Sequence, residues 1–403
     1  MKIVWIKTEL LHPVNRGGRI RTYEMLRALS AEHEIVYVTL DDGTAANDAV
    51  ERATEYASLV QRVPFRTAVR GSPRFYFELA WHVVRSTLPY ALYKYRVPEL
   101  ERQIMVAVRA HKPDVVICDF LAPAVNMPRG LSTPTVLFQH NVESFIWERH
   151  AHVARSALTR LFFGEQYRRM RNWERRLCAQ FDHVIAVSET DAAAFRTQFG
   201  VGSVSSVATG VDVAYFAPQA IERRPGSIVF TGAMDWLPNV DGIEWFVREC
   251  FPEIRRRHAD ARLSIVGRDP APRIQALHDP ENGIEVTGTV PDVRPYLAQA
   301  AAVVVPLRIG GGTRLKIFEA LSMNCPMVST PIGAEGLPVE HDRHLLLAEH
   351  ASEFTEALST LLASPMAAAA LGSQGGEHVR AKFSWAGVAA DFAAQCWAVA
   401  RAG

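Results

Sequence analysis

Short apolar runs alternate along this chain with amphipathic helical patterns. The first runs cover residues 2–6 and 35–39, and residues 19–29 between them place most apolar side chains on one side of a helix. Continuous apolar runs predict strands that are buried on both faces of a parallel sheet. This β-loop-α-β order is typical of the start of a doubly wound α/β domain, in which ligands gather at the carboxyl ends of the strands.

The same alternation continues to residue 199. It predicts further strands at 114–118, 135–138 and 183–187, and helices within 75–110 and at 153–177 and 190–199. The helix expected at 153–177 carries seven arginines and two glutamates, with apolar side chains between them. Two interpretations remain open: the helix lies on an anionic membrane surface, or it packs on the sheet with its arginines in solvent.

A polar segment at 209–226 interrupts the alternation, which then starts again. Strands are expected at 227–231, 263–266, 284–286 and 300–306, with helices at 240–257, 273–278 and 293–300. We therefore predict an N-terminal Rossmann-like domain (1–208), a C-terminal Rossmann-like domain (209–382) and a final helix (383–403). Two such domains facing each other would leave a cleft in which two substrates meet.

Composition and charge exclude some classes of protein. The chain has 403 residues, 48% of them apolar, and a net charge of +1, which gives no general attraction to nucleic acid. Residues 1–215 hold 27 Lys and Arg against 22 Asp and Glu (+5), and the remainder holds 17 against 21 (−4). The basic half either faces an anionic partner or membrane, or reflects chance scatter.

The cysteines and the hydropathy of the chain indicate the cellular compartment in which the protein works. The five cysteines are widely spaced and form no Cys-x-x-Cys pair, which favours a reducing cytoplasm. Lys7 and Glu9 interrupt the first apolar run, so it predicts a strand and not a signal peptide. No apolar run reaches the roughly 18 residues of a spanning helix. We expect a cytoplasmic protein, either free or peripherally attached to the inner face of the membrane.

The strongest candidate for chemistry follows the strand at 300–306. Glycines occupy 310–312, and a helix is expected from 313 to about 323. Glycines let backbone N–H groups approach an anion, and the helix dipole adds positive charge there. The chain has no Gly-x-x-x-x-Gly-Lys-Ser/Thr loop, so this is not a P-loop. It predicts a diphosphate site, surrounded by three cations: Arg308, Arg314 and Lys316.

Seven short motifs occur in an order and spacing that cover nearly the whole chain. They are Asn15-Arg-Gly-Gly18, Gln139-His-Asn141, Val187-Ser-Glu189, Thr209-Gly-Val-Asp212, Phe230-Thr-Gly-Ala-Met-Asp-Trp-Leu-Pro-Asn239, Thr287-Gly-Thr-Val-Pro-Asp292 and Gly310-Gly-Gly-Thr-Arg-Leu-Lys-Ile-Phe-Glu-Ala320 with its continuation through 329–336. Each motif alone is weak. Together they resemble the retaining GT-B glycosyltransferases of family 4.

The resemblance implies an α/β GT-B fold in which the two domains bind different substrates. The C-terminal domain would hold a nucleotide-sugar donor, the N-terminal domain an acceptor, and the last helix would cross back to the first domain. It also implies that the reaction requires neither a metal nor a further cofactor. Glu319 matches the family's glutamate that meets the donor ribose, whereas Gly311 stands where relatives often carry a second glutamate. The family's frequent Arg/Lys pair would fall near Ala233 and Asn239, and it is absent.

Candidate site residues follow from these motifs and from their places after strands. For catalysis we name His140, which follows a predicted strand, with Arg314 and Lys316 acting on the departing diphosphate. An acceptor or diphosphate loop is expected at Gly17, Gly18 and Asn141. Donor contacts are expected from Gly232, Asp235, Arg308, Gly311, Gly312, Thr313, Arg314, Lys316 and Glu319. Each could instead have a structural role, such as a tight turn or a solvated helix end.

The expected function is retaining sugar transfer from a nucleotide-diphosphate sugar to a glycan or lipid-linked acceptor in cell-surface polysaccharide synthesis. Aligned donors at the diphosphate would stabilise its departure without a metal. Two alternatives remain: a sugar-nucleotide 2-epimerase of the same fold, and a non-catalytic protein that binds sugar nucleotides.

Overall fold

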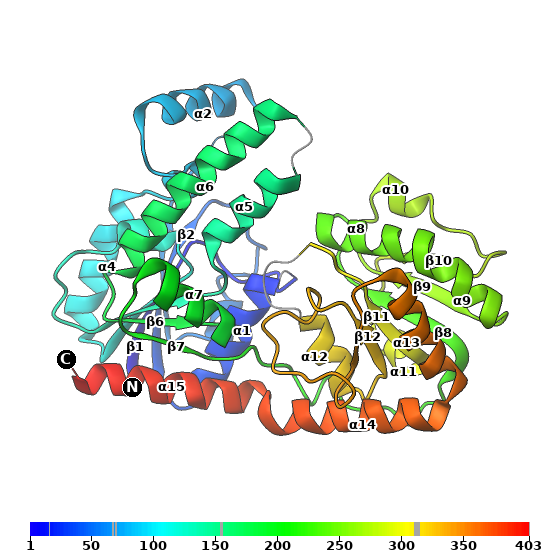
Figure 1. Cartoon of the computed structure of the whole chain (residues 1–403). Helices are drawn as coiled ribbons and strands as arrows, with labels where there is room; N and C mark the ends of the chain where they lie inside the picture. Colours follow the sequence, from blue (N-terminus) through cyan, green and yellow to red (C-terminus); the bar gives the residue numbers. More distant parts are fainter. Residues whose placement is uncertain (16, 67, 69–70, 154–155, 310–314, 403) are drawn as a thin grey trace. The chain divides into compact units, whose positions relative to one another are not determined.

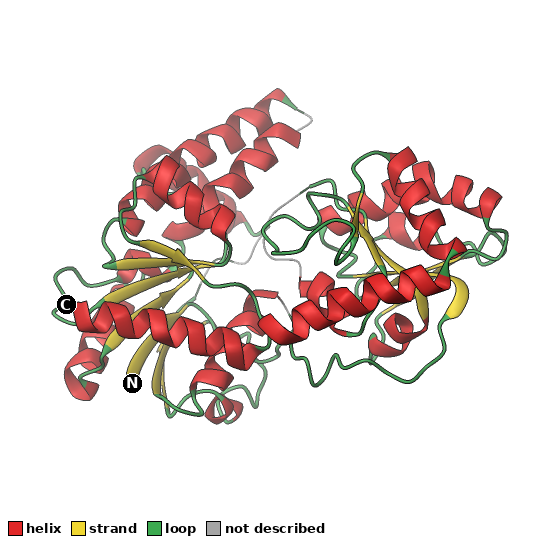
Figure 2. Ribbon diagram, turned by 60° about the horizontal axis from the view of Figure 1, so that its bottom comes forward, coloured by secondary structure: helices red, strands yellow, loops and turns green. Residues whose placement is uncertain are grey.

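The computed structural model describes every residue except 16, 67, 69–70, 154–155, 310–314 and 403. The chain divides into two compact units (Figure 1). The first comprises Met1–Thr209 and Ala386–Gly403, and the second comprises Gly210–Trp385. Each unit is a parallel sheet covered by helices (Figure 2).

The first sheet has seven parallel strands in the order β3-β2-β1-β4-β5-β6-β7. This is the strand order of a Rossmann fold with one strand added at the end. The strands are β1 (Lys2–Lys7), β2 (Glu34–Asp41), β3 (Leu59–Pro64), β4 (Val115–Asp119), β5 (Thr135–Gln139), β6 (His183–Ala186) and β7 (Val204–Ser206). The helices are α1 (Gly17–Leu29), α2 (Pro73–Arg85), α3 (Tyr90–Tyr93), α4 (Pro98–His111), α5 (Glu143–Val153), α6 (Ala157–Cys178), α7 (Glu189–Phe199) and α15 (Trp385–Ala402), with short 3-10 turns at Arg52–Glu55 and Pro123–Asn126.

The second sheet repeats this topology with six parallel strands in the order β10-β9-β8-β11-β12-β13. The strands are β8 (Arg224–Thr231), β9 (Arg262–Val266), β10 (Ile284–Gly288), β11 (Ala300–Val305), β12 (Met327–Ser329) and β13 (Leu346–Leu347). The helices are α8 (Leu237–Trp245), α9 (Phe251–Arg257), α10 (Pro272–Gln275), α11 (Arg294–Gln299), α12 (Leu315–Ser322), α13 (Ala351–Ala363) and α14 (Pro365–Lys382), with a π-helical turn at Phe246–Cys250.

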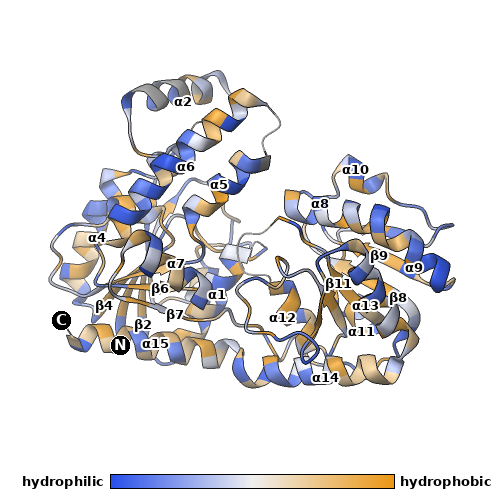
Figure 3. Cartoon of the chain, in the orientation of Figure 1, coloured by the Kyte–Doolittle hydropathy of each residue, from blue (hydrophilic) through white to orange (hydrophobic). Residues whose placement is uncertain are grey.

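Apolar strands with two covered faces hold each unit together (Figure 3). In β1, Val4 belongs to a core that includes Leu100 and Ile104 of α4, while Trp5 on the opposite face contacts Phe392 of α15 with ring centroids 5.7 Å apart. Successive strand residues point to opposite faces, so a fully apolar run fits a sheet covered on both sides. The C-terminal helix therefore covers one face of the first sheet.

Three predicted helices differ in the structure. The helix expected at 153–177 is α6, which begins later, at Ala157, because Ser156 accepts a hydrogen bond from the Thr159 N–H as its N-cap; α5, which ends at Val153, precedes it and is not predicted by the apolar pattern. The glycine pair expected in a loop forms the first turn of α1, which starts at Gly17. The helix expected at 240–257 starts earlier, at Leu237, and contains the π-helical turn.

Among the described residues, no single helix is both long and apolar enough to cross a bilayer. Only α13 and α14 meet these criteria, and only as a pair bent by 106°.

Candidate functional site

Each sheet has one point at which the strand order reverses. In the first unit this switch point lies between β1 and β4, and in the second between β8 and β11. Ligands of doubly wound sheets bind outside the carboxyl ends of the strands at this point, because the following loops diverge there to opposite faces. The predicted site residues are therefore best examined at these two places, one unit at a time.

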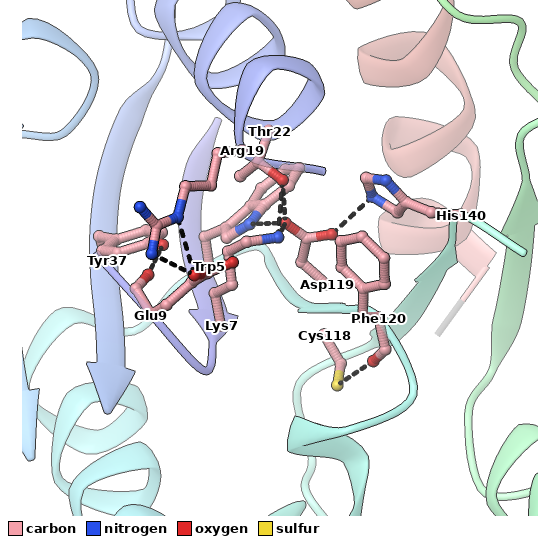
Figure 4. A network of polar contacts seen from close by, with 10 residues as sticks. All are labelled: Trp5, Lys7, Glu9, Arg19, Thr22, Tyr37, Cys118, Asp119, Phe120 and His140. Atoms are coloured by element: carbon pink, nitrogen blue, oxygen red, sulfur yellow. Dashed lines mark hydrogen bonds and ion pairs between the residues drawn. The ribbon is translucent and has the colours of Figure 1, made fainter. Parts of the chain in front are cut away.

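The carboxylate of Asp119, the last residue of β4, is the centre of a buried network at the first switch point (Figure 4). Its Oδ2 atom accepts hydrogen bonds from Thr22 Oγ1 at 2.6 Å, Lys7 Nζ at 2.9 Å and Trp5 Nε1 at 3.1 Å. Asp119 and Thr22 are fully buried and Lys7 is 1% exposed. Burial opposes the charge of Asp119, but Lys7 and the hydrogen bonds outweigh it and hold the pKa of the carboxyl far below its usual range.

His140 follows β5 and contacts the other carboxylate oxygen, with Nε2 2.7 Å from Asp119 Oδ1. Its ring stacks on Phe120 with centroids 3.8 Å apart, and the side chain is 3% exposed. Burial lowers the pKa of His140 to about 3 despite the opposing effect of Asp119. The imidazole is therefore neutral at pH 7.

The other residues predicted in the first unit lie around this network. Gly18 packs against Phe120, since a Cβ atom at Gly18 would lie 3.1 Å from the Phe120 ring. Gly17 begins α1 with open space beside it, and Asn141 is half-buried after His140. The carboxyl ends of β1, β4 and β5 thus bring residues 17–18 and 140–141 toward one edge of the first sheet.

The second switch point holds Lys316, which α12 presents to the loop after β8. Lys316 Nζ donates to Asn239 Oδ1 at 2.8 Å, and Asn239 Nδ2 donates to the Ala233 carbonyl at 2.8 Å. A Cβ atom at Gly232 would lie 2.6 Å from Asn239 Nδ2 and 2.8 Å from Lys316 Nζ. A side chain at 232 would therefore have to displace both groups.

Glu319 lies one turn further along α12. Its side chain is half-buried, and burial raises its pKa to about 7, although the Lys316 charge lowers it. Hydrogen bonds fix the other end of the helix: Arg380 Nη1 donates to the Ser322 carbonyl at 2.6 Å and to Asn324 Oδ1 at 2.7 Å. The cation of Arg380 thus pairs with the last backbone carbonyl of α12 and with the Asn324 side chain, and it fixes the helix that carries Lys316 and Glu319.

The structure also describes two further residues that were predicted to contact the donor, Arg308 and Asp235. Arg308 forms a bidentate ion pair with Asp241, at 2.7 and 3.0 Å, so its charge is already balanced. Asp235 is exposed in the loop after β8. The remaining predicted residues, Gly311, Gly312, Thr313 and Arg314, lie outside the described part of the chain. Within the described residues no group of three His, Cys, Asp or Glu side chains is placed to hold a metal ion.

Sequence reasoning missed the centre of the first site. In the sequence Lys7 only interrupts an apolar run, and Asp119 and Thr22 belong to none of the motifs. A signal was present: Lys7 and Asp119 are charged residues at the carboxyl ends of two predicted parallel strands. Such positions meet at one edge of the sheet, and a charge there is buried only if a partner compensates it.

Comparisons with known proteins agree with this geometry. Residues 16–215 match the family model "Glycosyltransferase Family 4", and residues 225–364 match "Glycosyl transferases group 1". The chain is 25% identical over 252 residues to the lipopolysaccharide core biosynthesis mannosyltransferase LpcC of Rhizobium leguminosarum bv. viciae, covering 58% of this chain and 69% of that protein.

Solved structures share the fold over the whole chain. Sucrose-phosphate synthase from Thermosynechococcus elongatus superposes with a TM-score of 0.71 at 16% identity, covering 100% of both chains. Anabaena HepE, solved in complex with UDP, has a TM-score of 0.66 at 15% identity, covering 99% of this chain and 100% of that one. The predicted GT-B fold is thereby confirmed. With one model matched by each unit, this chain belongs to the group 1, family 4 glycosyltransferases and is a sugar-transferring enzyme.

Proposed function

We propose that this enzyme is a retaining glycosyltransferase that moves a sugar from a nucleotide-diphosphate sugar to a glycan or lipid-linked acceptor in cell-surface polysaccharide synthesis. The second unit would bind the donor, and the first unit would bind the acceptor. The similarity to a lipopolysaccharide core mannosyltransferase and to a structure that contains UDP supports both substrate classes.

The observation that carries the donor assignment is the setting of Lys316. Its ammonium group is held by Asn239 of α8, next to Gly232, where a Cβ atom would lie 2.8 Å from it. A fixed cation at a switch point stabilises negative charge as it develops on a departing diphosphate. Glu319, one turn away, is the group we assign to the ribose hydroxyls.

In the proposed reaction the bond between the anomeric carbon and the diphosphate oxygen breaks, and the electron pair leaves with the diphosphate. The acceptor hydroxyl oxygen forms the new bond on the same face of the sugar, and its proton passes to a phosphate oxygen. Neutral His140, in close contact with Asp119, offers an imidazole nitrogen to a sugar hydroxyl. No metal takes part in this scheme.

A thermal-shift panel of UDP-, GDP- and dTDP-sugars tests the proposal. Stabilisation grows as RT ln(1 + [L]/Kd), so one nucleotide should stand out. With that donor, NMR of the product should show the anomeric configuration of the donor, and activity should survive EDTA. An inverted product, a loss of activity in EDTA, or full activity of a His140→Ala variant would contradict the corresponding part of the scheme.

A further inference from the structure

The loop between β8 and α8 carries two large apolar side chains that the proposed chemistry does not use. Trp236, the residue before α8, and Leu237, its first residue, are each 41% exposed. Single exposed apolar residues are ordinary, so the setting of such a ring has to show whether it has a function. This loop follows a central strand at the carboxyl edge of the second sheet, next to the switch point, where ligands of doubly wound sheets bind.

Backbone hydrogen bonds on both sides of Trp236 hold this loop in place. On one side, the Met234 N–H donates to the Arg268 carbonyl at 2.9 Å, and the Ala271 N–H donates to the Met234 carbonyl at 3.2 Å. These two bonds join the loop to the segment after β9. On the other side, the Asn239 N–H donates to the Trp236 carbonyl at 3.0 Å in the first turn of α8. The backbone that carries the ring is therefore already ordered, so a ligand that binds there does not meet the cost of ordering it.

Asn239 also connects the ring to the cation of the donor site. Its backbone bonds to Trp236, and its side-chain oxygen accepts a hydrogen bond from Lys316 Nζ at 2.8 Å. Trp236 and Asn239 are three residues apart, within one helical turn of about 5.4 Å. The transferred sugar is bonded directly to the diphosphate, which is the group assigned to Lys316. A sugar on a diphosphate bound by Lys316 would therefore lie within reach of the Trp236 side chain.

The polar neighbour of the ring also suits a sugar. Asp235, directly before Trp236, is exposed. A hexose has a face of C–H groups and an edge of hydroxyl groups; an indole ring covers the face, and a carboxylate accepts hydrogen bonds from the hydroxyls. A nucleobase would stack on an indole as well, but Glu319, the residue assigned to the ribose, lies on α12 and not on α8. The arrangement therefore favours the sugar over the base.

We propose that Trp236 stacks on the sugar ring of the nucleotide-diphosphate sugar, and that Asp235 accepts a hydrogen bond from one of its hydroxyl groups. The inference rests on the proposed function, because it requires that the second unit binds the donor through Lys316. Trp236 then distinguishes a nucleotide sugar from the free nucleotide diphosphate, whereas Lys316 responds to the diphosphate whether or not a sugar is attached. The ring thereby contributes to the choice of the sugar that is transferred.

Paired calorimetry on the full-length protein tests the inference with UDP and UDP-glucose, GDP and GDP-mannose, and dTDP and dTDP-glucose. For the pair that binds, Trp236→Ala should weaken the nucleotide sugar at least about tenfold and change the free nucleotide diphosphate by less than about twofold. Retained binding of the nucleotide diphosphate also shows that the variant is folded. Trp236→Phe should restore most of the loss, because a smaller aromatic ring still stacks. Trp397→Ala, at a tryptophan of α15 that is 36% exposed, should bind both ligands as wild type.

Three results would overturn the inference. Equal weakening of both ligands by Trp236→Ala would place the ring on the nucleotide. Unchanged binding of both ligands would remove the ring from the donor, even if the acceptor KM rose, because the ring would then serve the acceptor. A wild-type protein that binds none of the pairs would overturn the inference together with the proposed function. The Lys316→Ala variant separates the two, since it should weaken the nucleotide diphosphate and the nucleotide sugar alike if the proposed donor site is correct.

Discussion

The ammonium group of Lys316 lies 2.8 Å from the side-chain oxygen of Asn239, 77 residues earlier in the sequence. The amide group of Asn239 is itself fixed by the Ala233 carbonyl, so the cation has a defined position beside Gly232. Preorganised charge of this kind acts on a transition state without the cost of reorienting when the reaction occurs.

We expect Lys316→Ala to raise the donor KM or lower kcat at least about tenfold, which corresponds to roughly 1.4 kcal/mol. Loss of the cation removes stabilisation of the diphosphate and leaves the Asn239 oxygen without this donor. Lys382→Ala, at an exposed lysine of the same unit, is the matched control. Steady-state kinetics with the donor identified by thermal shift provide the measurement, and unchanged constants would remove Lys316 from the site.

Gly232→Ala should impair donor binding even though it removes no functional group. Its Cβ atom would collide with Asn239 Nδ2 and approach Lys316 Nζ, so the cation must move. A displacement of about 1 Å at a catalytic group commonly lowers activity on the order of a hundredfold. Gly202→Ala, where a Cβ atom meets nothing within 4 Å, should have no such effect. Donor affinity by calorimetry distinguishes the two, and equal affinities would refute the steric argument.

Asp119→Asn should reduce both stability and transfer. It leaves Lys7 buried without a counter-charge, which typically costs about 3–5 kcal/mol, and it weakens the hold on His140. The folded pKa of Asp119 lies below the unfolded value near 4, so its stabilisation is present above about pH 4 and is lost as the pH falls below it. Urea unfolding at pH 7 should show the difference, which should shrink in acid.

The control for this experiment is Asp48→Asn, at an exposed aspartate of the same unit. It should leave the unfolding midpoint nearly unchanged. An Asp119→Asn protein as stable as wild type at pH 7 would mean that the Asp119 carboxylate does not stabilise the buried charge of Lys7.

Glu174 should make the protein less stable at alkaline pH. It is fully buried on α6 and accepts hydrogen bonds from the Glu143 and Ser144 N–H groups at the start of α5, at 2.7 and 3.0 Å. Burial nevertheless raises its pKa to about 8. The unfolded carboxyl ionises near pH 4, so this group costs stability progressively as the pH rises from about 4 to 8, by at most about 1.4 kcal/mol per pH unit.

Glu174→Gln should therefore flatten the pH dependence of unfolding, relative to wild type, between about pH 5 and 8. Glu101→Gln, on the exposed face of α4, should leave the slope as it is. Urea midpoints across this range are the measurement, and parallel slopes for wild type and Glu174→Gln would exclude the effect.

The raised pKa of Glu319 predicts that donor affinity depends on pH. Burial raises its pKa to about 7, with Lys316 opposing the shift. An ionised carboxylate is the stronger acceptor for ribose hydroxyls, so affinity should rise between about pH 6 and 8. Glu319→Gln should bind more weakly at pH 8 and lose this dependence. A wild-type affinity that does not change across this range would argue against ribose contact by Glu319. His140 cannot produce the effect, because its pKa is about 3.

The apolar runs of the sequence by themselves determined two parallel α/β units and the places of Lys316, Glu319 and His140 after their strands. Local pattern suffices for this, because a strand buried on both faces requires continuous apolar residues. The sequence did not determine where α6 begins, which the Ser156 cap decides, or the start of α1 at Gly17.

Only the tertiary structure decided which charged groups pair with one another. Lys7 and Asp119 lie 112 residues apart and meet because β1 and β4 are neighbours at the switch point. Burial then fixes the protonation of the neighbouring groups: it keeps His140 neutral and raises the pKa of Glu319 to about 7. These properties depend on distance and on exclusion of water, neither of which is encoded in any single stretch of the chain.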